Sequence, residues 1–584
     1  MTLAGRYTMP MAAILITLAV DAATQHAHRN PPVALAPHVQ ALERGAAPSR
    51  AKAASPADYY VRPGGGDSHT GLAPEEAWQS FANVNAGAFG PGDRILLEGG
   101  AVFTQGLSFG ASSVGLAESP IVVTSFGAGR AKIAPPSGSA ITVYNTGGFE
   151  FRNLELAGPG RTNAGAHEGV HLLADDANGA KFRHVVLKDL DIHGFFRNGV
   201  HVQSWHASDP GFEGIRIEDC QVHDNGLNGI FSWGVFRSGA TAHYAHRDIQ
   251  IRGCRVYSNP GQPNWPSHSG SGIQLSFVDG ALIEFCEAYE NGALNDACGG
   301  PVGIWAWEAN GVVIQHCEAH HNRSRSGCDG GGFDLDGGVT NSVMQYNYSH
   351  DNVGAGFGLF QFEEAHPYAN NVVRYNITQN EGMAGIHFWS ANSNGGIRGT
   401  LVHNNTVFVG PQQAAGIADL DIGASYIYNT RLYNNLIVSH SGRALVDLPH
   451  PGDAWDFRGN AYYDSTGAAR FRWSGTDYMG LAAWRAASGQ EDGTGLEVDP
   501  KLCAPGAGGT IASLHGLAQL HAYRLMEDSP LIGAALDLQT QFGVNPGPRD
   551  FYGAIVPAFG GADIGAHEYG MVDVCRCPEN GPSR

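Results

Sequence analysis

Between residues 199 and 389 the chain repeats a short alternation of apolar and variable positions. In each copy a glycine is followed by an apolar residue, a variable residue, an apolar or small residue and a second variable residue. The copies are Gly199-Val-His-Val-Gln203, Gly229-Ile-Phe-Ser-Trp233, Gly272-Ile-Gln-Leu-Ser276, Gly303-Ile-Trp-Ala-Trp307, Gly332-Phe-Asp-Leu-Asp336, Gly356-Phe-Gly-Leu-Phe360 and Gly385-Ile-His-Phe-Trp389. Such alternation is typical of a β-strand with one buried face, so each copy predicts a strand whose variable positions point outward.

The spacing of the copies predicts a stack of similar units. Their glycines follow one another at steps of 30, 43, 31, 29, 24 and 29 residues. A second marker recurs at steps of 34, 32, 31, 30 and 29 residues: Cys220, Cys254, Cys286, Cys317, Asn347 and Asn376. A second strand and a turn follow in each unit, and no helical apolar pattern separates the units. A period near 30 residues made of strands and turns predicts an all-β parallel β-helix, a solenoid in which each coil pairs with the next.

In these repeats the chain resembles the right-handed parallel β-helix superfamily, which includes pectate lyases and many secreted polysaccharide-degrading enzymes. The resemblance covers roughly residues 58–460. It implies a right-handed solenoid and a glycan-active protein, although the fold by itself does not fix the activity. The full motif set of one β-helix group, the polygalacturonases (Asn-Thr-Asp, Asp-Asp, Gly-His-Gly and Arg-Ile-Lys), is absent, because only an Asp-Asp pair occurs, and this speaks against a pectin hydrolase of that group.

The two ends of the chain differ from the repeats. Arg6 precedes an apolar run that ends at Val20, which predicts a signal peptide too short to span a membrane. His567 and Glu568 lie in an apparent C-terminal cap, where structural hydrogen bonding is the favoured role. The predicted organisation is a signal peptide (1–23), a linker (24–57), an N-terminal cap with the first coils (58–140), the β-helix (141–460), a C-terminal capping segment (461–570) and a tail (571–584).

Composition narrows the classes of partner. The chain of 584 residues has 81 glycines, 43% hydrophobic and 15% charged residues, and a net charge of −20. Clustered Lys and Arg, which nucleic-acid binding requires, are lacking. We expect a secreted monomer, extracellular or periplasmic, with no membrane insertion and no required cofactor, whose partner is a polysaccharide or oligosaccharide.

The sequence contains nine cysteines. Four of them occupy one position of successive coils, which favours a buried stack of small side chains over disulfides or a metal site. Cys298 and Cys328 precede two successive strands, so a disulfide between these loops is predicted. Cys503 is a candidate partner for Cys575 or Cys577.

The outward positions of the repeated strands carry the candidate chemistry. When the coils are stacked about 4.8 Å apart, these positions form rows on one sheet surface. The surface combines Trp and Phe rings with carboxylates, amides and imidazoles, a mixture suited to stacking on sugar rings and bonding to hydroxyls. The predicted substrate-binding residues are His201, Gln203, Trp233, Gln274, Trp305, Trp307, Arg323, Phe360, Glu364 and Trp389. An open groove is favoured over the alternative in which long loops cover a packed aromatic face.

Asp334 and Asp336 are the central catalytic candidates. Two residues apart on one strand, their Cβ atoms should lie about 6.6 Å apart on the same side. Two carboxyl groups so placed can act as acid and base, with a separation closer to the inverting range of about 6.5–9.5 Å. Glu308 is a further carboxylate candidate, and His387 should lie two coils from the aspartates, where it could polarise a substrate hydroxyl. The predicted activity is glycoside hydrolysis.

Three alternatives remain open at this point. With Asp329, the two aspartates offer oxygen ligands for Ca²⁺. A polysaccharide lyase acting on uronic acids is the second enzyme hypothesis, although no Lys occurs between Lys188 and Lys501 to act as base. In that case Arg323, Arg325, His268 or His321 would have to serve. A non-catalytic glycan-binding surface protein is the third alternative.

Overall fold

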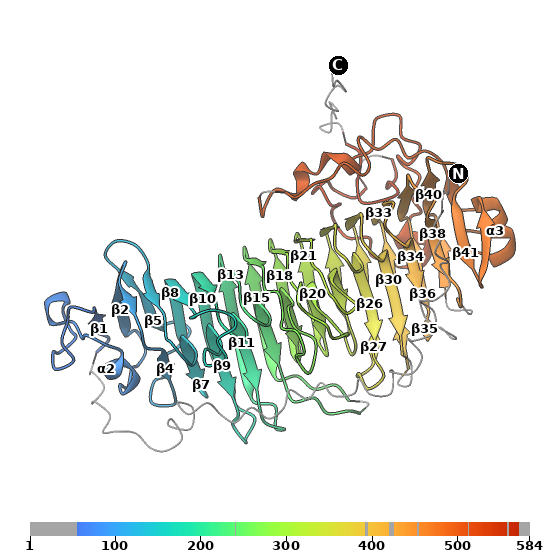
Figure 1. Cartoon of the computed structure of the whole chain (residues 1–584). Coiled ribbons are helices and arrows are strands. Elements are labelled where there is room, and N and C mark those ends of the chain that lie inside the picture. Colours follow the sequence, from blue (N-terminus) through green and yellow to red (C-terminus); the bar gives the residue numbers. More distant parts are fainter. Residues whose placement is uncertain are drawn as a thin grey trace, which may run out of the picture.

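The computed structural model describes residues 55–570 except 240, 392–394, 420–425, 452–454, 512 and 558–559. The predicted signal peptide, most of the linker, the tail, Cys575 and Cys577 lie outside the described residues. The chain forms an elongated stack of coils that runs from β1 (Asp58–Val61) to β43 (Leu496–Glu497) (Figure 1). Nearly every strand pairs in parallel with the equivalent strand of the next coil, so the predicted all-β parallel β-helix is confirmed.

The first face of the stack contains the strands predicted from the glycine phrases. Its strands in chain order are β4 (Leu107–Phe109), β7 (Ile141–Tyr144), β9 (Val170–Ala174), β11 (Val200–Ser204), β14 (Ile230–Trp233), β17 (Ile273–Ser276), β20 (Val302–Trp307), β23 (Gly331–Leu335), β26 (Phe357–Gln361), β30 (Ala384–Ser390), β34 (Ala415–Asp419), β38 (Ala444–Leu448), β41 (Arg470–Trp473) and β42 (Thr476–Met479). Only the last pair, β41 and β42, is antiparallel among the described strands of this face.

The remaining strands form two further faces, joined in the long strands β8 (Phe149–Ala157) and β10 (Lys181–His193). The second face continues with β1, β2 (Arg94–Glu98), β5 (Ile121–Phe126), β12 (Gly211–Glu218), β15 (His246–Arg252), β18 (Val278–Glu284), β21 (Asn310–Gln315), β24 (Val343–Gln345), β28 (Val372–Arg374), β32 (Leu401–His403), β36 (Thr430–Tyr433), β39 (Trp455–Arg458) and the short β27 (Tyr368–Ala369), β31 (Ile397–Arg398) and β35 (Ile427–Tyr428). The third face continues with β3 (Val102–Phe103), β6 (Ala131–Ile133), β13 (Gln221–His223), β16 (Arg255–Tyr257), β19 (Glu287–Tyr289), β22 (Glu318–His320), β25 (Tyr348–His350), β29 (Ile377–Gln379), β33 (Thr406–Val409), β37 (Leu436–Ser439), β40 (Ala461–Asp464) and β43.

Helices are short and lie at the ends. The described ones are η1 (Pro74–Glu76), α2 (Ala82–Asn85), α3 (Leu481–Ser488), η2 (Leu517–Gln519), η3 (His521–Tyr523) and α4 (Leu538–Phe542). None of the described helices is long and apolar enough to cross a membrane.

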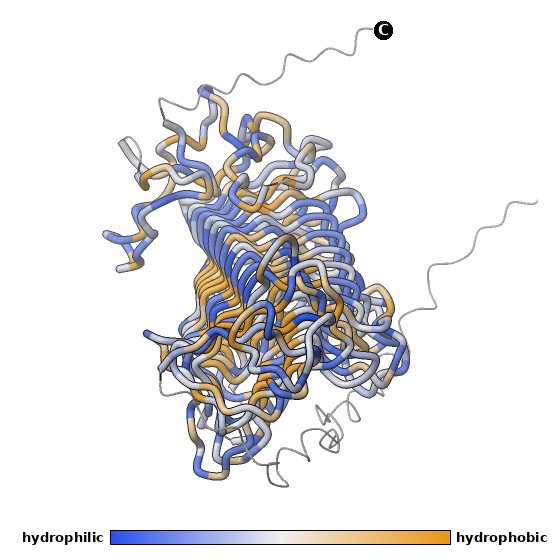
Figure 2. The backbone as a smooth tube through the Cα atoms, turned by 90° about the vertical axis from the view of Figure 1, so that its left-hand side faces the viewer, coloured by the Kyte–Doolittle hydropathy of each residue, from blue (hydrophilic) through white to orange (hydrophobic). Residues whose placement is uncertain are grey.

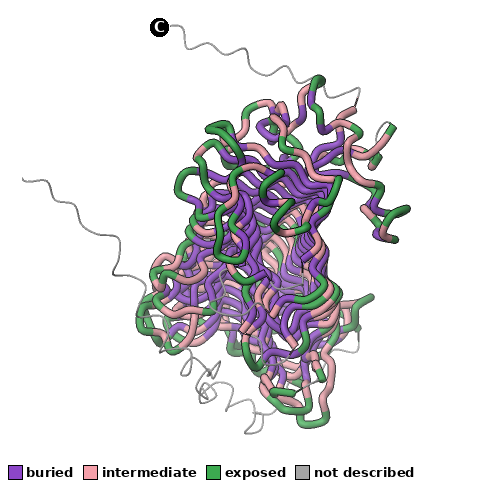
Figure 3. Tube along the Cα trace, turned by 90° about the vertical axis from the view of Figure 1, so that its right-hand side faces the viewer, coloured by how far each residue is buried: buried purple, intermediate pink, exposed green. Residues whose placement is uncertain are grey.

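The coils stay in register because equivalent side chains stack along the whole axis. Seen along that axis, hydrophobic and hydrophilic positions form continuous bands (Figure 2), and the buried chain lies inside exposed peripheral loops (Figure 3). Cys220, Cys254, Cys286 and Cys317 are buried neighbours in the core, as predicted. Asn347 continues their column as a buried ladder in which the side-chain amide of each Asn bonds to the Asn of the next coil. These bonds satisfy amide groups that would otherwise be costly to bury.

A second buried ladder follows the turns. Asn225, Asn259, Asn291, Asn322 and Asn352 each bond to the next coil. In the following coil the ladder position is taken by Glu381, whereas the preceding residue, Asn380, adopts a positive φ of 55°. A carboxylate oxygen accepts the same backbone N–H that an amide oxygen would.

The segment after β43 folds back over the third face (Figure 1). Gly508 exchanges hydrogen bonds with Gln379, and the backbone N–H of Ile511 donates to Glu318 at 2.8 Å. His567 Nδ1 accepts the N–H of Leu525 and Glu568 accepts the N–H of Asp563, both at 3.0 Å. The expected structural role of His567 and Glu568 is therefore confirmed.

Candidate functional site

The strand register on the first face agrees with the rows predicted from the sequence. Trp305 pairs with Gln274 on one side and Asp334 on the other, and Gly358 lies between Asp334 and His387. We call the first set of outward residues the central column: His201, Phe231, Gln274, Trp305, Asp334, Gly358 and His387. The second set, the outer column, contains Gln203, Trp233, Ser276, Trp307, Asp336, Phe360 and Trp389.

The predicted open wall is wrong for the middle of this face. Only 2% of Trp305 and 1% of Trp307 are exposed. The ring N–H of Trp305 donates to Ser271 Oγ at 3.0 Å, and His268 packs edge-on against the Trp305 ring. Side chains of the loops between coils thus occupy the space that a sugar was expected to fill.

The outer column is covered by two further loops. Trp307 packs against Trp233, Phe277 and Phe362, with ring centroids between 5.2 and 6.0 Å apart. Phe236 lies against Phe277 and Phe362 and extends the same cluster. The covered-face alternative therefore holds for Trp305 and Trp307, because the connections after β14 and β26 are long and carry aromatic side chains.

The face is hollowed at the end nearer the N-terminus. A pocket is lined by Arg197, Asn198, His201, Gln203, Trp205, Leu227, Asn228, Phe231, Trp233, Trp265, Ser267, His268 and Gln274. Four of the predicted substrate-binding residues, namely His201, Gln203, Trp233 and Gln274, are thus brought together. The mixture of indole rings with amide and imidazole groups is typical of a site for a small polar ligand.

A carboxylate behind this pocket was missed in the sequence. Glu168 is 2% exposed, and its Oε1 lies 3.4 Å from His201 Nδ1. Burial opposes its charge, but His171 and His201 hold the pKa of Glu168 well below its usual value. His171 Nε2 lies 2.9 Å from Gln203 Oε1. The signal was present, since His171 occupies the outward position of a glycine phrase one coil before His201.

Asp334 and Asp336 lie near the other end of the covered region. Asp334 is 2% exposed and its Oδ1 has no hydrogen-bond partner. Burial raises the pKa of Asp334 well above its usual value, and the nearby charges of Asp336 and Asp329 add to the shift. Asp336 is half-buried and accepts the N–H of Gly337 at 2.6 Å. Burial raises its pKa to about 7 despite that hydrogen bond.

Glu308 is engaged in the covering of the face. It is 1% exposed, forms an ion pair with His366 Nδ1 and accepts the backbone N–H of His366 at 2.9 Å. This contact attaches the loop after β26 to the strand end at Trp307. The geometry gives the proposed catalytic role of Glu308 no support, because both carboxylate oxygens already have protein partners.

His387 differs sharply from Glu308. It is buried, neither ring nitrogen has a hydrogen-bond partner, and its ring meets Phe360 edge-on with centroids 5.2 Å apart. Burial lowers the pKa of His387 to about 4, so the ring is neutral at physiological pH. Phe360 is half-buried, and Trp389 is 37% exposed. Beyond the aspartates the outer column is therefore open to solvent.

The predicted residues in loops lie at the surface. Arg323 is exposed in the connection between β22 and β23, and Glu364 is exposed in the connection after β26. His321, a candidate base for a lyase, lies on the third face next to His320, away from the aspartates. Neither the strand register nor any hydrogen bond or ring contact of the described structure brings these three side chains to the columns.

The disulfide between Cys298 and Cys328 is present, as predicted. The neighbouring Asp329 accepts the N–H groups of Gly299 and Gly300, both at 2.8 Å. Among the described residues, Asp329, Asp334 and Asp336 do not form a group of three close ligand atoms. This geometry gives the calcium alternative no support, because Asp329 is occupied in joining the two disulfide-linked loops.

Comparison with known proteins bears on the fold. Residues 168–407 match the family model described as the right handed beta helix region. The right-handed parallel β-helix is confirmed. No curated protein matched the chain.

Several solved structures are similar to the chain at low identity and with TM-scores under 0.5. A GH136 lacto-N-biosidase from Eubacterium ramulus is 19% identical, with a TM-score of 0.47 over 70% of this chain and 67% of its own. Pectate lyase Pel9A is 17% identical, with a TM-score of 0.42 over 88% and 97%. The A-module of the mannuronan C-5 epimerase AlgE6 from Azotobacter vinelandii is 14% identical, with a TM-score of 0.38 over 70% and 90%. At these identities the likeness concerns the fold alone.

The central column of this β-helix collects buried polar atoms that lack protein partners. They are His201 Nε2, Gln274 Oε1, Asp334 Oδ1 and both ring nitrogens of His387. Leaving such a group unpaired costs about 1–3 kcal/mol, so a row of them on one sheet face is a candidate ligand-binding surface. Within this row the covered Trp305 separates the pocket from Asp334.

Proposed function

We propose that the protein is a secreted enzyme that hydrolyses glycosidic bonds of a polysaccharide or oligosaccharide, with Asp334 as general acid and Asp336 as general base. The observation that carries the proposal is the unequal environment of these two neighbouring carboxyl groups. Burial raises the pKa of Asp334 well above its ordinary value and so favours its protonated form, whereas the pKa of Asp336, about 7, leaves that group partly ionised. A pair of this kind can divide acid and base roles.

The proposed reaction uses both carboxyl groups once. Asp334 donates its proton to the glycosidic oxygen as the bond to the anomeric carbon breaks. Asp336 takes a proton from a water molecule whose oxygen forms the new bond to that carbon. Neutral His387 accepts or donates a hydrogen bond to a sugar hydroxyl, because its buried nitrogens have no protein partner.

A glycine, Gly358, lies between Asp334 and His387 in the central column. A Cβ atom at Gly358 would lie 2.9 Å from Asp334 Oδ1 and 2.7 Å from the Phe360 ring. The missing side chain therefore leaves room for the Asp334 carboxyl group and the Phe360 ring, which lie directly against the backbone of Gly358. The half-exposed Trp389, one coil further, offers an aromatic surface for an adjoining sugar.

The pocket around His201 and Gln274 offers a separate place for part of a longer substrate, on the far side of the covered Trp305. Gln274 lies two coils from Asp334 in the central column, which corresponds to about 10 Å. Trp233 and Trp265 provide flat apolar surfaces, and Gln203 and Gln274 provide amides for hydroxyl groups. The disulfide Cys298–Cys328 fits an exported protein, because such bonds persist in oxidising compartments.

The test is an activity screen against neutral and uronic-acid polysaccharides with two readouts. We expect new reducing ends without ultraviolet-absorbing unsaturated products. Unsaturated products would show that the protein is a polysaccharide lyase and not a hydrolase. Binding of a polysaccharide without either product would support the non-catalytic glycan-binding alternative.

Substitutions then connect the activity to the aspartates. We expect D334N and D336N to lose turnover while keeping the far-ultraviolet circular dichroism of the wild type. D447N is the matched control, since Asp447 is a half-buried aspartate of the same face on β38, paired with Arg472 at 3.8 Å. Full turnover in D334N and D336N would exclude the assigned roles.

A further inference from the structure

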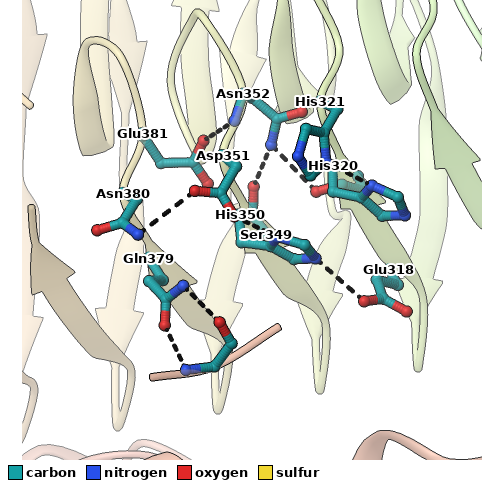
Figure 4. A network of polar contacts seen from close by, with 12 residues as sticks. Glu318, His320, His321, Ser349, His350, Asp351, Asn352, Gln379, Asn380 and Glu381 are labelled. Carbon is teal, nitrogen blue, oxygen red and sulfur yellow. Dashed lines mark hydrogen bonds and ion pairs between the residues drawn. The ribbon is translucent and has the colours of Figure 1, made fainter. Parts of the chain in front are cut away.

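The third face contains a compact group of metal-ligating side chains that the proposed hydrolysis does not use. Glu318 and His320 lie on β22, and His350 lies on β25 one coil later. Each of the three can offer one ligand atom such that all these atoms lie within 4.8 Å of one another, and all three side chains are buried. Figure 4 shows the three side chains together with their polar neighbours.

Both imidazoles are oriented by the residue that follows them. His320 Nδ1 lies 2.8 Å from His321 Nδ1, and His350 Nδ1 lies 2.8 Å from Asp351 Oδ2. His321 and Asp351 each have a φ of 54°, which turns their side chains back toward the preceding ring. In both rings Nδ1 is thus held by a neighbour. Such second-layer contacts fix the orientation of metal-binding histidines.

The other nitrogen of each ring points to a carboxylate. His350 Nε2 lies 3.1 Å from Glu318 Oε1, and His320 Nε2 lies 3.3 Å from Glu287 Oε1. Two ligand atoms about 2.0–2.2 Å from one ion lie close to 3 Å apart, so the Glu318–His350 spacing already suits a shared cation. The stacked His320 ring, with its centroid 4.8 Å from that of His350, supplies the third donor.

We propose that Glu318, His320 and His350 form a binding site for a divalent transition-metal ion, with Zn²⁺ as the best fit to two imidazoles and one carboxylate. Asp351 and His321 hold the two histidines, and Glu287 lies next to His320. The C-terminal segment closes the site, because the N–H of Ile511 donates to Glu318 Oε1 at 2.8 Å. A bound ion would therefore join two coils underneath that segment.

The chain provides a matched arrangement that does not form such a group. Asp191 and His193 on β10, followed one coil later by His223, repeat the order of Glu318, His320 and His350. His223 Nε2 lies 3.0 Å from Asp191, and Asp224 contacts His223 Nδ1 as Asp351 contacts that of His350. In the described structure only the Glu318 set brings three ligand atoms within 4.8 Å. His223 therefore serves as an internal control.

The experiment is a titration of the purified, chelator-treated full chain with Zn²⁺ by calorimetry, accompanied by the absorption spectrum with Co²⁺. We expect the wild type to bind one equivalent of Zn²⁺. E318Q and H350Q should bind Zn²⁺ at least 100-fold more weakly, so that this equivalent is lost. D351N should weaken binding about 10–100-fold, because it alters only the partner of His350. H223Q should bind as the wild type does.

Folding is monitored in each variant by circular dichroism and by thermal unfolding with and without Zn²⁺. The wild type and H223Q should be stabilised by the ion, whereas E318Q, which retains the shape of the side chain, should not. Absence of a Zn²⁺ equivalent in the wild type would overturn the proposal, as would unchanged binding in both E318Q and H350Q. Loss of the Zn²⁺ equivalent in H223Q, with binding retained in E318Q and H350Q, would place the metal site near His223 and would also overturn the proposal.

Discussion

On the third face, His223, His320 and His350 each lie within 3.3 Å of a carboxylate from the preceding coil. On the first face, Asp334 and His387 are just as deeply buried, yet polar atoms of both lack any hydrogen-bond partner. Both faces belong to the same stack of parallel strands. The difference is that these histidines of the third face are paired with carboxylates, whereas Asp334 and His387 of the central column have polar atoms without a partner in the protein.

This contrast has a physical basis. An unpaired buried donor or acceptor costs about 1–3 kcal/mol, and a paired one contributes modestly to stability. Substitutions on the two faces should therefore affect different properties of the protein. On the third face they should reduce stability, and in the central column they should reduce function with little loss of stability.

The largest expected effect is on catalysis by Asp334. We predict that D334N lowers turnover about 10²–10⁴-fold, since the proton donor is removed. Its stability at pH 7 should not fall: because burial raises the pKa of Asp334, its contribution to stability is present at low pH and is lost as pH rises. Turnover numbers and chemical denaturation measure both effects. A large loss of stability with retained turnover in D334N would show that Asp334 has a structural role and not a catalytic one.

The second prediction compares two histidines on opposite faces with a chelator present. H350L should lower the free energy of unfolding by about 3 kcal/mol, because Glu318 is left buried without its partner. H387L should raise it by about 1 kcal/mol, because two unpaired nitrogens are removed from a buried position. Urea denaturation of both variants decides the matter. Equal destabilisation would show that the nitrogens of His387 are satisfied in solution.

The third prediction concerns pH. The base Asp336 has a pKa of about 7, so activity should fall roughly tenfold per pH unit below that value as this carboxyl group becomes protonated. At higher pH the profile should fall again when Asp334 loses its proton. Initial rates from acid to alkaline pH test this, with folding checked at each pH. An acidic limb near the ordinary pKa of Asp would contradict the burial of Asp336.

The smallest effect is expected at the open end of the outer column. W389A should raise KM a few-fold and change stability by less than about 0.5 kcal/mol, because the ring is 37% exposed. W307A is the contrasting variant, since Trp307 is packed inside the aromatic cluster and its loss should cost about 3 kcal/mol or more. Steady-state kinetics and thermal unfolding separate the two. Similar behaviour of both variants would mean that Trp389 is covered in solution.

Periodic features of the sequence predicted the fold and the strand register well. Alternation placed Trp305 beside Asp334 and His387 beyond Gly358, and the coil spacing located the disulfide. These inferences succeeded because each coil repeats its neighbour. The covering of Trp305 and Trp307 was not predicted, since the loops that cover them have no period.

Contacts between non-equivalent positions were also beyond the reach of the pattern. Glu308 and His366 are 58 residues apart and belong to a strand end and a loop. Ile511 reaches Glu318 across 193 residues from a segment outside the repeats. No local signal indicates such pairs, whereas His171, which stacks on His201, could have been found by extending the glycine phrase one coil earlier.

The returning C-terminal segment changes how the molecule should come apart. A solenoid in which every coil touches only its neighbours can fray from either end. In this protein the C-terminal segment forms hydrogen bonds to the coils that contain Glu318, Gln379 and Asn404. These coils should therefore unfold together and not one by one. The end nearer the C-terminus should therefore open as a block, leaving the first coils as the place where unravelling begins.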